Sequence, residues 1–319
     1  MKLINQSATL VVEDNPLKLV ELAGRVSHKS EDRITDDSYK SFLISMLKLG
    51  HTATLEFASV YLEIRDFSSL DSNNDYENIV FKNTDNSSNY CKIKLVPNIA
   101  YIYTNLRYLL NKFPNIFMDF INNEFPSFVY EFEPKDNDPY KRYCFNIITN
   151  RGVSHELVRH RVFSFLQEST RYCNYSKDKF SNELNIINPF NNFIKDNNNI
   201  NKAVYLDILE QIEYIYMDLI TCDSKLKAQE ARGILPNDLK TELYMSGFLK
   251  DWVGHNVEDT IYEIYGEEVK VTNRLGFDTL RNDKSAHPQA REIAEQIKVQ
   301  LVETIGEESW NAIKETYYE

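Results

Sequence analysis

Two stretches in the C-terminal half of the chain repeat apolar residues at helical spacing, and they restrict the possible folds most strongly. Residues 199–227 and residues 286–305 carry apolar side chains three or four positions apart, which predicts two long amphipathic helices. Runs rich in β-branched and aromatic residues, at 91–97 and 142–150, predict strands. The nine glycines contain no GxGxxG motif, so we do not expect a Rossmann domain.

Shorter patterns predict further elements along the chain. The polar stretch 68–90, rich in Asn, Asp and Ser, predicts a long loop or an inserted excursion. Other segments have strand or helix patterns of ordinary length: strands at 1–12 and 51–67, and helices from Pro16, at 36–50 ending with Gly50, at 98–113, at 116–125 and from 151 onward.

Composition and charge limit the class of protein. A formal charge of −12 makes the general surface repel nucleic acid, so a basic cluster within it predicts a local pocket for a small anion. The sequence lacks an apolar run long enough to cross a bilayer and a secretory signal at its start, so we expect a cytoplasmic protein. The four cysteines (Cys91, Cys144, Cys173 and Cys222) form no CxxC pair, which predicts reduced thiols.

The densest chemical signal is RHRVFSFLQESTRY, which gathers Arg159, His160, Arg161 and Arg171 within thirteen positions. An arginine-rich helix end often makes only surface ion pairs. Here the large apolar neighbours predict a partly buried guanidinium that needs a planar anionic partner such as phosphate. A zinc site is not expected, because His155 and His160 are five positions apart and diverge by about 140° on a helix.

The residues that follow carry complementary polar groups. If the helix continued, Ser164, Gln167, Glu168 and Arg171 would share one face and could contact a nucleotide base and its phosphate. Ser169 has no His–Asp relay at a recognisable spacing, so we expect it to donate hydrogen bonds instead of acting as a nucleophile.

Five segments in order resemble the flavin-dependent thymidylate synthases. They are GRVSHKS, HTATLEFASVYLEI, ITNRGVSHELVRHR with the RHR…S…STR pattern after it, EARGILPNDLKTEL and LRNDKSAHPQAREIA. The resemblance implies an α+β fold, with a small antiparallel sheet packed against long helices. It also implies one domain over residues 1–319, with inserted segments at about 66–140 and 254–276.

The resemblance further implies an enzyme that methylates dUMP to dTMP. Methylenetetrahydrofolate would donate the carbon, FAD would carry the hydride and NADPH would reduce the flavin. A homotetramer with active sites between subunits is implied, and neither a metal nor a protein nucleophile is required. We therefore interpret Cys173 as a packing residue.

The resemblance assigns roles residue by residue. Arg281 is the expected catalytic residue, a fixed cation that stabilises charge on the uracil when N3 ionises. Arg171 and Arg232 are the expected phosphate ligands. The substrate-binding positions are Glu156, Arg159, Gln167, Glu168, Ser169, Thr170, Arg171, Arg232 and Arg281. The flavin-binding positions are Ser27, His51, Arg159, His160, Arg161, Gln167, His255 and His287.

This chain departs from the pattern at Phe57, at Leu166 and Gln167, and at Phe248, where the family has a His, an Asn–Glu pair and an Asn. These changes leave open a related flavin enzyme that alkylates another pyrimidine nucleotide. A non-catalytic alternative is a nucleic-acid-binding module that uses arginines and the 20 tyrosines, although the net charge opposes it.

Overall fold

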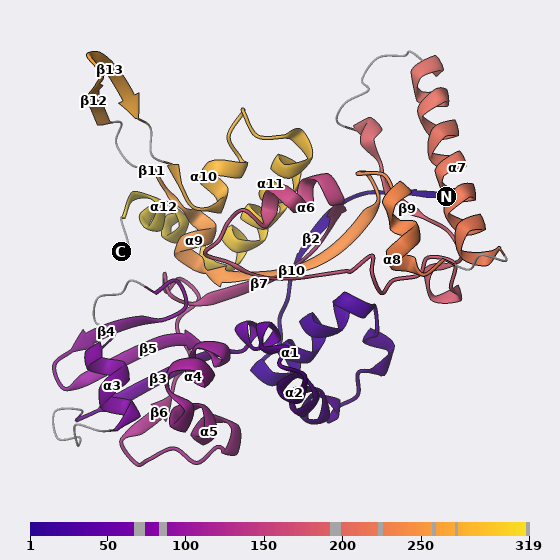
Figure 1. Cartoon of the computed structure of the whole chain (residues 1–319). Coiled ribbons are helices and arrows are strands. Elements are labelled where there is room, and N and C mark those ends of the chain that lie inside the picture. Colours follow the sequence, from indigo (N-terminus) through magenta and orange to yellow (C-terminus); the bar gives the residue numbers. More distant parts are fainter. Residues whose placement is uncertain are drawn as a thin grey trace.

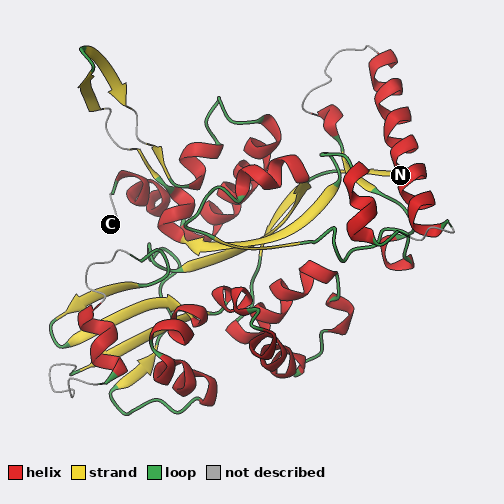
Figure 2. Cartoon of the chain, viewed as in Figure 1, coloured by secondary structure: helices red, strands yellow, loops and turns green. Residues whose placement is uncertain are grey.

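The central feature of the computed structural model is an antiparallel sheet of four strands in the order β2-β7-β10-β8 (Figures 1 and 2). The structure describes residues 1–66, 74–82, 88–191, 199–222, 226–256, 260–271 and 274–316. The strands are β2 (Ser7–Leu10), β7 (Arg142–Asn150), β8 (Ser164–Gln167) and β10 (Lys240–Phe248). The expectation of a mixed fold with small antiparallel sheets and long helices is therefore confirmed.

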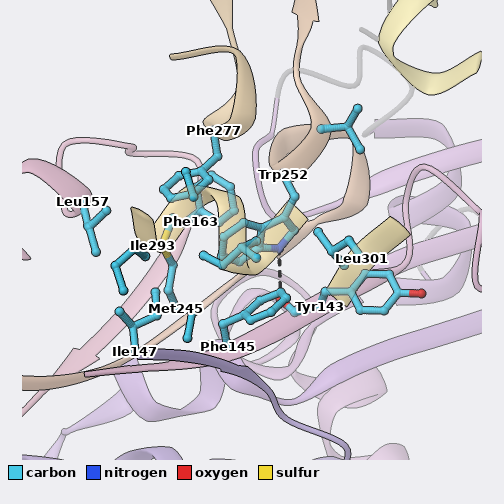
Figure 3. Packing of buried hydrophobic residues seen from close by; sticks show 14 of the residues in the cluster. Tyr143, Phe145, Ile147, Leu157, Phe163, Met245, Trp252, Phe277, Ile293 and Leu301 are labelled. Carbon is cyan, nitrogen blue, oxygen red and sulfur yellow. Dashed lines mark hydrogen bonds between the residues drawn. The ribbon is translucent and has the colours of Figure 1, made fainter. Parts of the chain in front are cut away.

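Five helices lie on one side of this sheet (Figure 1). Their bounds are α6 (Arg151–Leu157), α9 (Leu249–Val253), α10 (Phe277–Arg281), α11 (Pro288–Ile305) and α12 (Glu307–Glu315). Phe145 and Met245 point from the sheet into the apolar core that these helices cover, and the Trp252 indole donates a hydrogen bond to the Tyr143 carbonyl (Figure 3). The predicted helix at 286–305 is confirmed as α11.

The opposite face of the sheet is covered by the N-terminal helices (Figure 1). They are α1 (Pro16–Arg25), the 3-10 turns η1 (Val26–His28) and η2 (Glu31–Arg33), α2 (Ser38–Leu49) and η3 (Thr52–Phe57). Asn15 caps α1 through its side chain, and Gly50 ends α2 in the left-handed conformation. Phe57, Cys144 and Tyr244 share one buried cluster on this face.

A second antiparallel sheet has the order β4-β5-β3-β6, and its core also takes in Val20, Leu43 and Leu55 of the N-terminal helices. Its strands are β3 (Ser59–Arg65), β4 (Lys92–Val96), β5 (Ile99–Asn105) and β6 (Val129–Glu131). Helices α3 (Asp75–Lys82), α4 (Leu106–Lys112) and α5 (Pro114–Asn122) pack with it. Most of this unit falls within the segment 66–140, whose status as an insertion stays a prediction.

The remaining elements flank the central sheet. On one side, β1 (Lys2–Ile4) pairs in parallel with β9 (Asn185–Ile187), near η5 (Asp178–Phe180), η6 (Pro189–Asn191), α7 (Asn199–Thr221), α8 (Ala228–Ala231) and η7 (Arg232–Ile234). On the other side, β11 (His255–Asn256) pairs with β14 (Arg274–Leu275), and the hairpin of β12 (Thr260–Ile264) and β13 (Glu267–Val271) projects away from the helices (Figure 1).

Three predicted elements were wrong over part of their length. The predicted helix at 98–113 begins as β5, because residues 99–105 pair with both β3 and β4, and Asn105 then caps α4 by accepting from the Tyr108 amide. The predicted strand at 51–67 begins with the 3-10 turn η3. The predicted loop at 68–90 contains α3, while residues 67–73 and 83–87 lie outside the described residues.

The helical face predicted for Ser164, Gln167, Glu168 and Arg171 was also wrong. Helix α6 ends at Leu157, and residues 164–167 form β8, which pairs with Leu243–Ser246 of β10. Alternation along this strand separates Ser164 from Gln167, which therefore lie on opposite faces of the sheet. Within the described residues, no helix is long and apolar enough to cross a membrane.

Candidate functional site

Arg281 is held by three hydrogen bonds at the end of α10. Its Nε donates to His160 Nε2, its Nη1 donates to the Glu156 carboxylate, and its Nη2 donates to the Glu156 carbonyl, each at 2.8 Å. Arg281 thus contacts His160 and Glu156, which precede it in the sequence by 121 and 125 positions. We call Glu156, Arg159, His160 and Arg281 the Arg281 group. All four are residues that the sequence assigned to the site.

The His160 ring is buried next to aromatic side chains, with its centroid 5.1 Å from that of Phe277. Burial, and then the Arg281 cation, lower the pKa of His160 to about 4. The imidazole is therefore neutral at pH 7, so Nε2 accepts from Arg281 and the proton lies on Nδ1. His160 orients the guanidinium without adding a charge.

The electrostatic surroundings of Arg281 are mixed. Burial lowers the pKa of Arg281, the Glu156 carboxylate raises it, and the neighbouring Arg159 cation lowers it again, with a lowered pKa as the result. Arginine nonetheless stays protonated at neutral pH because its ordinary pKa is so high. His160 and Glu156 accept from three of the five N–H groups of Arg281, and the other two belong to its terminal nitrogens.

A cavity of about 440 Å³ opens beside Glu156. The predicted residues Glu156 and His287 line it, together with others that sequence reasoning missed: Asn150, Gly152, Val153, Pro189, Tyr205, Asn237, Asp238 and Gln289. An Asn before a helix and the PND sequence at 236–238 were the available signals, and each is more often structural.

The orientation of Gln289 at this cavity follows from its neighbours. Asn150 accepts from the Val153 amide through Oδ1, so its Nδ2 donates to Gln289 Oε1 at 2.8 Å. Gln289 Nε2 is then directed away from Asn150, is buried, and has no hydrogen-bond partner in the described part of the chain. A buried donor of this kind matches an acceptor atom on a ligand.

A second set of predicted residues meets where the loop after β8 contacts η1. The Ser169 amide donates to the Ser27 carbonyl at 3.2 Å, and the Arg171 guanidinium lies 5.3 Å from the centre of the Tyr172 ring. His28 stacks on Tyr172 at 4.2 Å between centroids. Burial, then Lys179 and then His51, lower the pKa of His28, which places His51 in the same neighbourhood. We call Ser27, His51, Ser169 and Arg171 the Ser27 group.

Three further predicted residues between these groups have inward-facing contacts. Gln167 Nε2 donates to Ser154 Oγ at 2.9 Å and to Thr241 Oγ1 at 3.0 Å. Ser154 gives its own proton to the Arg151 carbonyl, which fixes the direction of the Gln167 amide. Glu168 is 3% exposed and Thr170 is 6% exposed.

The other predicted positions differ in exposure and in contacts. Arg161 and Arg232 are exposed, the latter at the start of η7. His255 places Nδ1 2.9 Å from the Lys314 carbonyl of α12. Cys173 is fully buried, and burial raises the pKa of its thiol to about 12, in keeping with a packing role. Among the described residues, no cluster of His, Cys, Asp and Glu could hold a metal ion.

Residues 141–254 match the family described as thymidylate synthase complementing protein. The match includes Glu156, the RHR triplet, residues 167–171 and Arg232, but not Ser27, His51, Arg281 or His287. Because the RHR segment and Glu156 fall inside it, the family match covers three of the four residues of the Arg281 group, and only Arg281 lies outside.

Curated relatives agree with this match. A flavin-dependent thymidylate synthase of Corynebacterium diphtheriae is 30% identical over 116 residues, which are 32% of this chain and 42% of the relative. A flavin-dependent thymidylate synthase of Mycolicibacterium gilvum is 28% identical over 44% of this chain and 56% of the relative. A probable one from Paramecium bursaria Chlorella virus 1 is 27% identical over 34% of this chain and 52% of the relative.

The chain thus spans about half of the length of the curated relatives that it matches. Among solved structures, a UMP/dUMP methylase from Streptomyces cacaoi bound with 5-Br dUMP covers 98% of this chain and 97% of its own, at 14% identity and a TM-score of 0.43. The resemblance to the flavin-dependent thymidylate synthases is confirmed by the family match and the curated relatives.

Proposed function

We propose that this chain methylates dUMP to dTMP, with methylenetetrahydrofolate as carbon donor, FAD as hydride carrier and NADPH as reductant. The observation that carries the proposal is the Arg281 guanidinium, oriented by His160 and by Glu156, which lines a cavity of about 440 Å³. The relatives by name support the same chemistry.

Arg281 would act on the uracil ring. Each of its terminal nitrogens carries a second N–H besides the one that bonds Glu156, and these donors suit a uracil whose N3 loses its proton. Because the three bonds to Glu156 and His160 are already formed, the cation needs little reorganisation when charge develops. Arg281 is thus proposed as the catalytic residue.

The nucleotide phosphate would bind at exposed cations. Arg171 on the 168–173 loop and Arg232 at the start of η7 are the proposed phosphate ligands, with the Ser169 hydroxyl beside Arg171. Arg159, Glu156, Gln167 and Thr170 complete the proposed substrate set. Guanidinium forks match the geometry of phosphate oxygens and cannot be titrated away at neutral pH.

The donor set near the cavity fits a flavin dinucleotide. Gln289 Nε2 is a buried donor without a partner among the described residues, and the exposed Arg159 and Arg161 could pair with a pyrophosphate. The proposed flavin-binding residues are Ser27, His51, Arg159, His160, Arg161, Gln167, His255 and His287. When bound, the flavin supplies the hydride chemistry that the protein side chains lack.

The separation of the Arg281 group from the Ser27 group supports an active site built between subunits. Each group holds only part of the proposed ligand set, and a symmetric assembly would place one group of one subunit against the other group of its neighbour. We therefore propose a homotetramer.

The test is an absorbance spectrum of the purified protein with and without dUMP, followed by a turnover assay. We expect flavin bands that dUMP perturbs, and dTMP formation that needs methylenetetrahydrofolate and NADPH. If the enzyme turned over dCMP but not dUMP, the substrate would be dCMP and the proposed dUMP methylation would be wrong. A colourless protein that binds long oligonucleotides more weakly as salt rises would refute the enzyme altogether.

A further inference from the structure

A buried ion-pair network connects the 168–173 loop with β10 and with Lys29. Both carboxylate oxygens of Glu168 have partners inside the protein: Oε1 accepts from the Tyr175 hydroxyl at 2.9 Å, and Oε2 accepts from Lys240 Nζ at 2.7 Å. The Glu168 side chain is 1% exposed and that of Lys240 is 14% exposed. Because its acceptors are engaged inward, Glu168 is badly placed to contact a nucleotide.

The network continues to a second glutamate and a second lysine. Glu242 Oε2 accepts from Lys240 Nζ at 3.2 Å and from Lys29 Nζ at 2.7 Å, and Lys29 Nζ also donates to Glu31 at 2.8 Å. Burial alone would lower the pKa of Lys29, but the Glu242 and Glu31 carboxylates together outweigh burial and raise it, so the lysine stays charged.

These side chains tie together three distant segments. The Glu168 amide donates to the Glu242 carbonyl at 2.8 Å, and the next amide, that of Ser169, donates to the Ser27 carbonyl. Lys29 follows Ser27 by two positions and has a φ of 48°, in the left-handed region that a lysine rarely adopts. A backbone held in such a conformation needs surrounding contacts to keep it there, and the Lys29 ion pairs supply them.

We propose that Lys29, Glu168, Lys240 and Glu242 form a clamp that positions the 168–173 loop against the Ser27 segment, and that Glu168 acts through this loop. Glu168 is then a positioning residue and not a nucleotide contact. The sequence DLKTEL, residues 238–243, would then serve to position the loop, since it contributes two of the four clamp residues, Lys240 and Glu242. The link from loop position to dUMP binding rests on the proposed function, whereas the clamp itself does not.

The clamp differs from a merely stabilising salt bridge in what it should change. A buried ion pair adds little net stability compared with apolar side chains of the same size, because its desolvation offsets the attraction. Loss of one partner, in contrast, leaves the other charge buried and unpaired. We expect this to release the loop locally and to weaken dUMP binding.

The experiment measures hydrogen exchange of the amides of residues 168–173 in the full chain without ligand, and dUMP affinity by calorimetry. In Lys240→Met we expect exchange at least about tenfold faster and dUMP affinity about tenfold weaker, because the remaining charges lose their partner. Lys240→Arg should restore both readouts. Lys40→Met, which breaks the exposed Lys40–Asp37 pair on α2, is the matched control and should change neither.

Two further variants keep the proposal testable. Lys29→Met opens the clamp from its other end and should also speed exchange in the loop, even if Lys240→Met fails to fold. Unchanged exchange in both lysine variants would overturn the clamp. Loss of dUMP affinity in Glu168→Gln with a fully protected loop would also overturn it, because Glu168 would then contact the nucleotide. Faster exchange in a protein that never binds dUMP would support the clamp and refute the proposed function instead.

Discussion

At the level of single residues, Arg281 combines a fixed position with incomplete neutralisation. Glu156 balances part of its charge, while His160 holds Nε without contributing a charge of its own. The cation is therefore ready for a further anionic partner, and its geometry does not depend on that partner. Such preorganisation is the usual source of electrostatic stabilisation in enzymes.

Replacing Arg281 tests this arrangement most directly. Arg281→Ala should lower the rate of dTMP formation by about 10²–10³-fold, the effect typical of removing a preorganised donor, while flavin stays bound. Arg281→Lys should recover only part of the rate because a compact ammonium lacks the planar fork whose three nitrogens bond His160, the Glu156 carboxylate and the Glu156 carbonyl at once. Arg33→Ala, at an exposed arginine of η2, serves as the control and should retain full turnover. Full activity in Arg281→Ala would remove the residue from the mechanism.

His160 predicts a pH dependence of stability. Its pKa is about 4 in the folded protein, below the ordinary 6.5, so the unfolded chain binds the proton more readily. The stabilising contribution is present above pH 6.5 and is lost as the pH falls toward 4. By pH 5 the wild-type protein should lose about 2 kcal/mol from this group. Urea unfolding at pH 7 and pH 5 measures the loss, which His160→Gln should not show.

At the level of elements, the sequence predicts best where local signals and packing agree. The α11 helix has a strong apolar period, and Gly50 supplies the left-handed end of α2. Segments β5 and β8 were misassigned because strand pairing with distant partners overrode their local pattern. The candidate site behaves alike: its residue types could be named from the sequence, but the pairing of Arg281 with His160 depends on α10 and α6 both packing against α11.

The junction that carries α10 contains a close contact between two glycines. Gly276 has a φ of 89°, and a Cβ on it would lie 2.1 Å from the Gly254 Cα. Gly276→Ala should therefore destabilise the fold by roughly 1–3 kcal/mol, through both backbone strain and overpacking. Gly266→Ala is the control, since Gly266 has a φ of 84° in the hairpin turn with open space around it. Thermal unfolding compares the two, and equal shifts would contradict the close-contact explanation.

At the level of the whole molecule, many of the proposed ligands fall into two groups that different elements support. The Arg281 group depends on α6 and α10 above the central sheet, whereas the Ser27 group depends on η1 and the loop after β8 (Figure 1). Neither group holds both a catalytic cation and a phosphate cation. If subunits combine the groups, the smallest complete site contains residues from two chains.

Subunit complementation tests this division. Arg281→Ala and Arg171→Ala should each be nearly inactive alone, because one lacks the cation at the uracil and the other lacks a phosphate ligand. When the two variants are co-expressed in equal amounts, random assembly places an intact Arg281 opposite an intact Arg171 in about one site in four. Turnover should therefore return to about a quarter of the wild-type value per site. Sedimentation of the mixed protein as a tetramer would accompany that recovery, whereas no recovery in a mixed tetramer would place the complete site within one chain.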